Sequence, residues 1–132
     1  MMSKTVMIVE DDTLNMKLFN DLLVFQGYNI IQQSDGLGAY DAICRHRPDL
    51  VLMDIHLPGC SGLDIAEAIK SNVEIKHIPV IAITAFAHQE DMRICLKHGC
   101  DGYIAKPISV HSFFETVSDF CKNIKPDLRV VH

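Results

Sequence analysis

The chain has 132 residues, close to the usual size of one compact domain, and 48% of them are hydrophobic, an ordinary globular composition. Its formal net charge of −5, with basic residues scattered along the chain, argues against a nucleic-acid-binding surface. Five cysteines without a Cys-x-x-Cys pair predict neither a disulfide framework nor a structural zinc site.

Short apolar runs alternate with segments of helical period five times along the chain. Residues 6–9 form a continuous apolar run that predicts a buried strand. The next segment has helical periodicity, and the apolar side chains that we expect on its core-facing stripe are Leu14, Leu18, Leu22 and Phe25. Residues 28–31 predict a second strand, which is less apolar and therefore nearer a sheet edge.

The middle of the chain predicts two further helices around a third strand. The second helix should be capped by Ser34 or Asp35 and run to about residue 46, burying Ala39, Ala42 and Ile43. Residues 50–53 are apolar throughout and predict the third strand. After a Pro-Gly turn, Ser61 can cap a helix whose inward side chains are Leu63, Ala66 and Ile69.

The last third of the chain repeats the pattern twice. Residues 80–83 predict the fourth strand, and residues 89–97 a helix that offers Met92, Cys95 and Leu96 to the core. Residues 102–105 predict the fifth strand. Ser109 then caps a long helix whose expected inner face is formed by Val110, Phe113, Val117, Phe120 and Ile124.

This alternation predicts an α/β fold, a (βα)5 doubly wound, five-stranded parallel sheet of order 2-1-3-4-5, which is flavodoxin-like. We expect one domain over residues 1–124 and a flexible tail over residues 125–132. The N-terminus lacks a signal-peptide pattern and no apolar stretch reaches membrane-spanning length, so a cytoplasmic protein without membrane insertion is expected. Ligands of such sheets bind where strand order reverses, here between the first and third strands.

Polar side chains end four of the apolar runs. Glu10 and Asp11 follow the first, and Asp54, Thr84 and Lys106 follow the third, fourth and fifth. Carboxylates held together repel one another, and Mg²⁺, which prefers oxygen ligands, removes that conflict. Beside a metal, Asp54 can act as a nucleophile toward phosphorus, Lys106 can neutralise the transferred group, and the Thr84 hydroxyl can bond a phosphoryl oxygen.

Ordinary structural explanations exist for some of these residues. Asp12 is placed to cap the first helix. Thr84 can also be a β-branched strand residue, and Lys106 a surface lysine, although its position between the fifth strand and Pro107 favours the crevice. Tyr103 can be explained as a packed strand aromatic.

The order of these motifs resembles that of a known family. Val9-Glu10-Asp11, Met53-Asp54, Thr84-Ala85 and Lys106-Pro107 resemble the signature of two-component receiver domains, the CheY-like family. The resemblance covers about residues 5–124. Among receivers, residues 8–11, 15–19, 62–63 and 106–110 are similar to those of single-domain regulators of cell division.

The resemblance implies that Asp54 accepts a phosphoryl group from a phosphohistidine of a sensor histidine kinase or phosphotransfer protein. It further implies that Glu10, Asp11, Asp54 and the backbone carbonyl of His56 bind Mg²⁺. The family often has Asp at the position of Glu10, so the longer side chain leaves open a contact through water. Lys106 would pair with the phosphoryl oxygen, and the Lys106–Pro107 peptide would be cis.

The family also implies how phosphorylation would be read. Thr84 would move toward the phosphoryl oxygen and Tyr103 would swing into the space, changing the surface of the fourth helix, fifth strand and fifth helix. His56 and Phe86 would set the phosphoryl lifetime. Since Phe86 has no acid or amide to orient water, slow self-hydrolysis is expected.

A single-domain response regulator is therefore expected, which switches protein–protein interactions in cell-division control and catalyses only its own phosphorylation and dephosphorylation. Expected partners are kinases, phosphatases, phosphotransfer proteins and adaptors, and the expected state is a monomer or weak dimer.

The alternative is a receiver-shaped interaction module that works without phosphorylation. An aspartyl phosphatase would need Asp-x-Asp where the chain has Asp54-Ile55-His56. A flavin-binding module would need a phosphate loop where the acids 10–12 repel phosphate.

Overall fold

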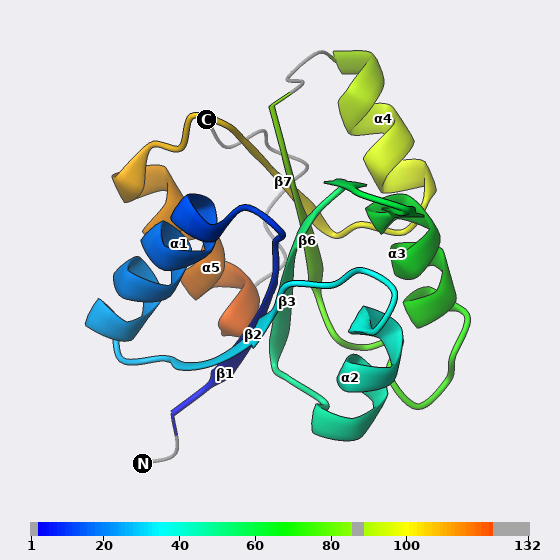
Figure 1. Ribbon diagram of the computed structural model, residues 1–132, viewed down its shortest axis with the longest axis horizontal. Helices are drawn as coiled ribbons and strands as arrows, with labels where there is room; N and C mark the ends of the chain where they lie inside the picture. Colours follow the sequence, from blue (N-terminus) through cyan, green and yellow to red (C-terminus); the bar gives the residue numbers. More distant parts are fainter. Residues whose placement is uncertain (1–2, 86–88, 123–132) are drawn as a thin grey trace.

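The computed structural model describes residues 3–85 and 89–122 (Figure 1). One parallel sheet has the order β2-β1-β3-β6-β7, formed by β1 (Thr5–Val9), β2 (Asn29–Gln33), β3 (Leu50–Asp54), β6 (Val80–Thr84) and β7 (Gly102–Ala105). The predicted fold class and strand order are confirmed, and the second strand lies at an edge. Phe86, Ile124 and the predicted tail, 125–132, fall outside the described residues.

Helices cover both faces of the sheet. Figure 1 shows α1 (Thr13–Phe25) and α5 (Val110–Cys121) on one face, and α2 (Ala39–His46), α3 (Gly62–Lys70) and α4 (Gln89–Lys97) on the other. Strands covered on both faces lie in an apolar environment, which explains why β3 and β6 are almost wholly apolar in sequence. Among the described helices, none is long and apolar enough to cross a membrane.

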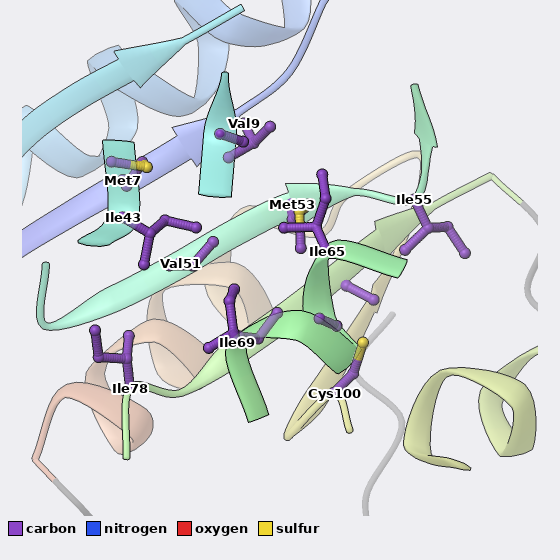
Figure 2. Close-up of a cluster of buried hydrophobic side chains, with 14 of the residues drawn as sticks. Met7, Val9, Ile43, Val51, Met53, Ile55, Ile65, Ile69, Ile78 and Cys100 are labelled. Atoms are coloured by element: carbon purple, nitrogen blue, oxygen red, sulfur yellow. The ribbon is translucent and has the colours of Figure 1, made fainter. Parts of the chain in front are cut away.

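The core has two parts, one on each face of the sheet. Figure 2 shows the part under α2 and α3, where Val51 and Met53 of β3 face Ile65 and Ile69 of α3. On the other face, Phe19 of α1 stacks on Phe113 of α5 with ring centroids 5.6 Å apart. This stack joins the two helices above the strands, so it fixes the position of α1 next to the end of β1.

Phe113→Ala is expected to lower the free energy of unfolding by about 3–5 kcal/mol, because it removes a fully buried ring and leaves a cavity. Chemical denaturation measures the change. Phe25→Ala is the matched control, since the Phe25 ring is 81% exposed and its loss should change stability by less than about 0.5 kcal/mol. Equal effects of the two substitutions would contradict the described packing.

The prediction for the buried face of α1 is wrong for Leu14, Leu18 and Phe25, whereas Leu22 is half-buried and packs against the core. Leu14 is 79% exposed and Phe25 81% exposed, whereas the buried side chains of this helix are Met16, Phe19 and Leu23. Both sets have helical spacing, so α1 carries two apolar stripes. The stripe that contains Phe19 is the buried one because Phe113 offers it an aromatic partner.

The second helix begins later than predicted. Gly38 is its N-cap residue, and the side chain of Asp35 instead accepts the Leu37 backbone N–H at 2.9 Å, closing a turn before the helix. Such local side-chain bonds compete with helix capping. The predicted buried residues of α2 are confirmed, namely Ala39, Ala42 and Ile43.

The last three helices match their predictions more closely. Ser61 caps α3, its hydroxyl accepting the Leu63 N–H at 3.2 Å. In α4 the fully buried side chain is Cys95. In α5, Phe113 and Val117 are buried as predicted, but Val110, the first residue of the helix, is 46% exposed.

A short antiparallel hairpin that the sequence did not predict follows β3. It pairs β4 (His56–Leu57) with β5 (Cys60–Ser61) around the Pro58-Gly59 turn. Gly59 has a φ of +69°, a conformation that glycine adopts without strain. The hairpin connects the end of β3 to the start of α3 beside the carboxyl edge of the sheet.

Candidate functional site

The strand arrangement brings the four predicted polar positions to one edge of the sheet. Glu10 follows β1 and Asp54 ends the neighbouring strand β3. Thr84 ends β6 and Lys106 follows its neighbour β7. Because strand order reverses between β1 and β3, this edge is where a doubly wound sheet binds its ligands.

Three carboxylates form a cluster at this edge. One oxygen from each of Glu10, Asp11 and Asp54 lies within 4.8 Å of the others. Glu10 and Asp54 are buried, and Asp11 is exposed. Asp12, next along the chain, does not join the cluster but caps α1, accepting two backbone N–H groups of the first turn. The cluster offers hard oxygen ligands of the kind that Mg²⁺ prefers.

Both oxygens of Asp54 have partners. Oδ1 accepts the backbone N–H of His56 at 2.8 Å, and Oδ2 accepts a hydrogen bond from Lys106 Nζ at 3.1 Å. Lys106 Nζ also lies 3.4 Å from Glu10 Oε2. One ammonium group therefore bridges the two buried carboxylates.

The electrostatics of the cluster favour an added cation. Burial, followed by the negative charge of Asp54, raises the pKa of Glu10 to about 7, and Lys106 offsets this only in part. Burial by itself would lower the pKa of Lys106, but Asp54 and then Glu10 more than compensate, so that this pKa is raised. One ammonium group thus does not neutralise the buried acids, and a divalent ion would relieve the remaining repulsion.

Gly62 contributes to the site through its small size, which sequence reasoning missed. A Cβ atom there would lie 2.7 Å from Ile55 Cα and 2.8 Å from the backbone oxygen of Asp54. The start of α3 therefore packs directly against the backbone that carries Asp54. The available signal was a glycine immediately after the capping residue Ser61.

Gly62→Ala is expected to lower the free energy of unfolding by about 2 kcal/mol, because the added methyl group must displace the backbone at Asp54. Displacement of the carboxylate should also weaken Mg²⁺ binding. Denaturation and calorimetric titration measure the two effects. Gly38→Ala is the matched control, since the new Cβ would meet only side-chain ends, Gln33 Nε2 at 3.0 Å and Asp35 Oδ2 at 3.7 Å, and no backbone. A neutral Gly62→Ala variant would contradict the close approach.

Thr84 and Tyr103 both lie buried on adjacent strands. Thr84 is at the carboxyl end of β6, beside the cluster, and is fully buried. Burial, then the neighbouring Cys95 and Asp91 of α4, raise the pKa of Tyr103 to about 12. Tyr103 also shares a buried cluster with Cys95 of α4, so its side chain lies on the face of the sheet that this helix covers.

Two further predictions concern His56 and the peptide bond between Lys106 and Pro107, both next to the site. The His56 residue begins β4, is exposed, and supplies the N–H that holds Asp54. The Lys106–Pro107 peptide is cis, as the family resemblance implied. The proposed effect of Phe86 on lifetime stays a prediction, since this residue lies outside the described ones.

Comparison with known proteins assigns the family. The profile of the response regulator receiver domain matches residues 6–118. The chain belongs to this receiver family. This receiver is 52% identical to the polar-differentiation response regulator DivK of Brucella anthropi over 119 residues, 90% of this chain and 97% of that protein. It is 51% identical to DivK of Brucella abortus over the same shares, so the predicted resemblance to receivers of this kind is confirmed.

Solved receiver structures share its fold. The receiver domain of a sensor histidine kinase from Pseudomonas aeruginosa, crystallised with a magnesium ion in its active-site cleft, has a TM-score of 0.84 and 29% identity. The matched region covers 92% of this chain and 99% of that one. CheY4 of Vibrio cholerae, a chemotaxis response regulator, has a TM-score of 0.84 at 20% identity, covering 90% and 99%. This second likeness concerns the fold alone.

Proposed function

We propose that this receiver accepts a phosphoryl group on Asp54 from a phosphohistidine of a sensor histidine kinase or phosphotransfer protein. One observation carries the proposal. The buried Asp54 carboxylate lies 3.1 Å from Lys106 Nζ and within 4.8 Å of two other acids, at the edge of the sheet where ligands bind. The likeness to DivK, a polar-differentiation response regulator, is what supports the further proposal of a role in cell-division control.

Glu10, Asp11 and Asp54 would hold Mg²⁺, with the backbone carbonyl of His56 as a further ligand. The chemistry of the donor set supports this, because the clustered ligand atoms are all carboxylate oxygens. The raised pKa of Glu10 marks negative charge that a cation would compensate. When bound, the ion would neutralise charge on the transferred phosphoryl group.

The transfer requires no general base, because an ionised carboxylate already carries the attacking lone pair. An oxygen of Asp54 forms a bond to phosphorus, the phosphorus–nitrogen bond of the phosphohistidine breaks, and its electron pair returns to the imidazole. Lys106 would hydrogen-bond the phosphoryl oxygens, and the 3.1 Å distance between its Nζ atom and Asp54 Oδ2 supports this role. The product is an aspartyl phosphate, which water later hydrolyses.

The proposed output is a change in protein–protein contacts. Thr84 would bond a phosphoryl oxygen, and Tyr103 would move into the space that it leaves. Support comes from their burial on adjacent strands and from the position of the Tyr103 side chain on the face of the sheet that α4 covers. The surface formed by α4, β7 and α5 would bind kinases, phosphatases or adaptor proteins in one of two states.

The proposal is tested with acetyl phosphate as the phosphoryl donor. In Mg²⁺ we expect a single phosphoryl group per chain, on the peptide that contains Asp54, released by hydroxylamine as an acyl phosphate should be. EDTA should abolish the label because the acid cluster then lacks its cation. Intact-mass spectrometry and peptide mapping measure both results. Labelling that survives EDTA, or that resists hydroxylamine, would contradict the assignment.

A further inference from the structure

The solvent face of α1 carries a second apolar stripe, which we call the α1 stripe. Its members are Leu14, Leu18, Leu22 and Phe25. Leu14 and Phe25 are about four-fifths exposed and Leu18 is 43% exposed, while Leu22, at the edge of the stripe, is half-buried and also packs against the core. A surface helix normally presents polar side chains to water, and an apolar row on that face marks an interaction site.

Charged residues border the α1 stripe on its solvent side. Lys17 and Asp21 are one turn apart and form an ion pair of 2.8 Å, with exposed side chains. On a helix of 3.6 residues per turn they lie beside Leu14, Leu18 and Phe25. The face therefore combines an apolar row with one positive charge toward its N-terminal end and one negative charge toward its C-terminal end.

We propose that the α1 stripe is the interface of a homodimer, in which α1 packs antiparallel on α1 of a second copy about a two-fold axis. The members of the stripe, at positions 14, 18, 22 and 25, are four, four and three residues apart, so their spacing is nearly the same from either end of the helix. An axis opposite residues 19–20 brings Leu14 to Phe25 of the second copy and Leu18 to Leu22 of the second copy. Such an isologous contact closes on itself.

The bordering charges select this arrangement over its alternative. In the antiparallel pair Lys17 faces Asp21 of the second copy, so each ion pair can be made across the interface as well as within the helix. A parallel pair would place Lys17 against Lys17 and Asp21 against Asp21, which is repulsive. Charge complementarity therefore favours a second copy of this chain in one orientation.

The dimer should be weak. α1 has 13 residues and spans roughly 20 Å, so one helical face buries less than the roughly 2000 Å² of permanent dimers. Each copy also carries a net charge of −5, and this repulsion is screened by salt. The inference concerns assembly and does not depend on phosphorylation of Asp54.

Sedimentation velocity of the full chain between about 5 and 500 µM tests the proposal. We expect a reversible monomer–dimer equilibrium for the wild type. Leu18→Glu should raise the dissociation constant more than about tenfold, since it buries a charge in the apolar row. Val73→Glu, at a 77% exposed position outside α1, is the matched control and should dimerise as the wild type does. A wild type that remains monomeric at the highest concentration would overturn the proposal and assign the stripe to another protein.

A charge exchange tests the orientation. Lys17→Asp alone and Asp21→Lys alone should each weaken the dimer, by about tenfold for two altered contacts. The double variant should recover wild-type affinity, because the opposite charges face each other again. Unchanged thermal unfolding of each variant at low concentration confirms the fold. Failure of the double variant to recover, or a dimer that persists in Leu18→Glu, would refute the antiparallel α1 contact.

Discussion

Asp54→Asn is expected to abolish labelling by acetyl phosphate in Mg²⁺. The amide has nearly the size and shape of the carboxylate, and its oxygen can still accept the His56 N–H that now holds Oδ1 at 2.8 Å. It lacks the negative charge and the reactive lone pair that attack phosphorus, so the fold should survive while the chemistry is lost. Intact-mass spectrometry, with circular dichroism for the fold, measures the two properties separately.

Asp64→Asn is the matched control for this substitution. Asp64 lies exposed in the first turn of α3 and undergoes the same loss of charge outside the cluster. Its labelling should equal that of the wild type. Undiminished label on a folded Asp54→Asn chain would mean that another residue accepts the phosphoryl group.

Lys106→Met is expected to raise the affinity for Mg²⁺ and to lower the rate of labelling by acetyl phosphate. The Lys106 ammonium group now pairs with Asp54 and Glu10, so it competes with a cation for both carboxylates. Its removal should strengthen Mg²⁺ binding roughly tenfold. The labelling rate should nevertheless fall about 100-fold, because the charge that would stabilise the transferred phosphoryl group is gone. Titration calorimetry and time-resolved mass spectrometry measure the two effects.

Lys97→Met, in the exposed last turn of α4, is the control for the loss of a lysine charge. It should change neither measurement. If Lys106→Met instead weakened Mg²⁺ binding, the lysine would be holding the acids in place rather than competing for them. The proposed competition between Lys106 and the cation would then be wrong.

The site could be predicted because its parts are local in sequence. Asp54 ends an apolar run, and Glu10 and Lys106 follow others, so each could be placed at a strand end without knowledge of distant contacts. Parallel connections then force these ends to one edge of the sheet. What the sequence could not supply was the close approach of Gly62 to the backbone of Asp54, which depends on how α3 docks.

The wrong predictions for the secondary structure share one cause. In each case the local sequence allowed more than one arrangement, and contacts in the folded chain determined which one forms. The periodicity of α1 fits two apolar stripes, and the stack of Phe19 on Phe113 determines which is buried. Asp35 has the chemistry of a helix cap, but its carboxylate closes the turn at Leu37 instead. The β4–β5 hairpin has two residues per strand, too few for any alternating pattern to be visible.

Few side chains of α4 are buried, and their number sets the free energy needed to displace this helix. Of its side chains, Cys95 alone is fully buried, while Met92 and Leu96 are half-buried. Moving a small buried side chain such as that of Cys95 into water costs about 1 kcal/mol, less than the cost for a buried Leu or Met. A bias of about 1 kcal/mol changes the ratio of two states roughly fivefold. In the proposed switch, a few new hydrogen bonds at the carboxyl end of β6, where Thr84 lies, would suffice to displace α4, whereas α5, with four buried side chains, would resist the same input.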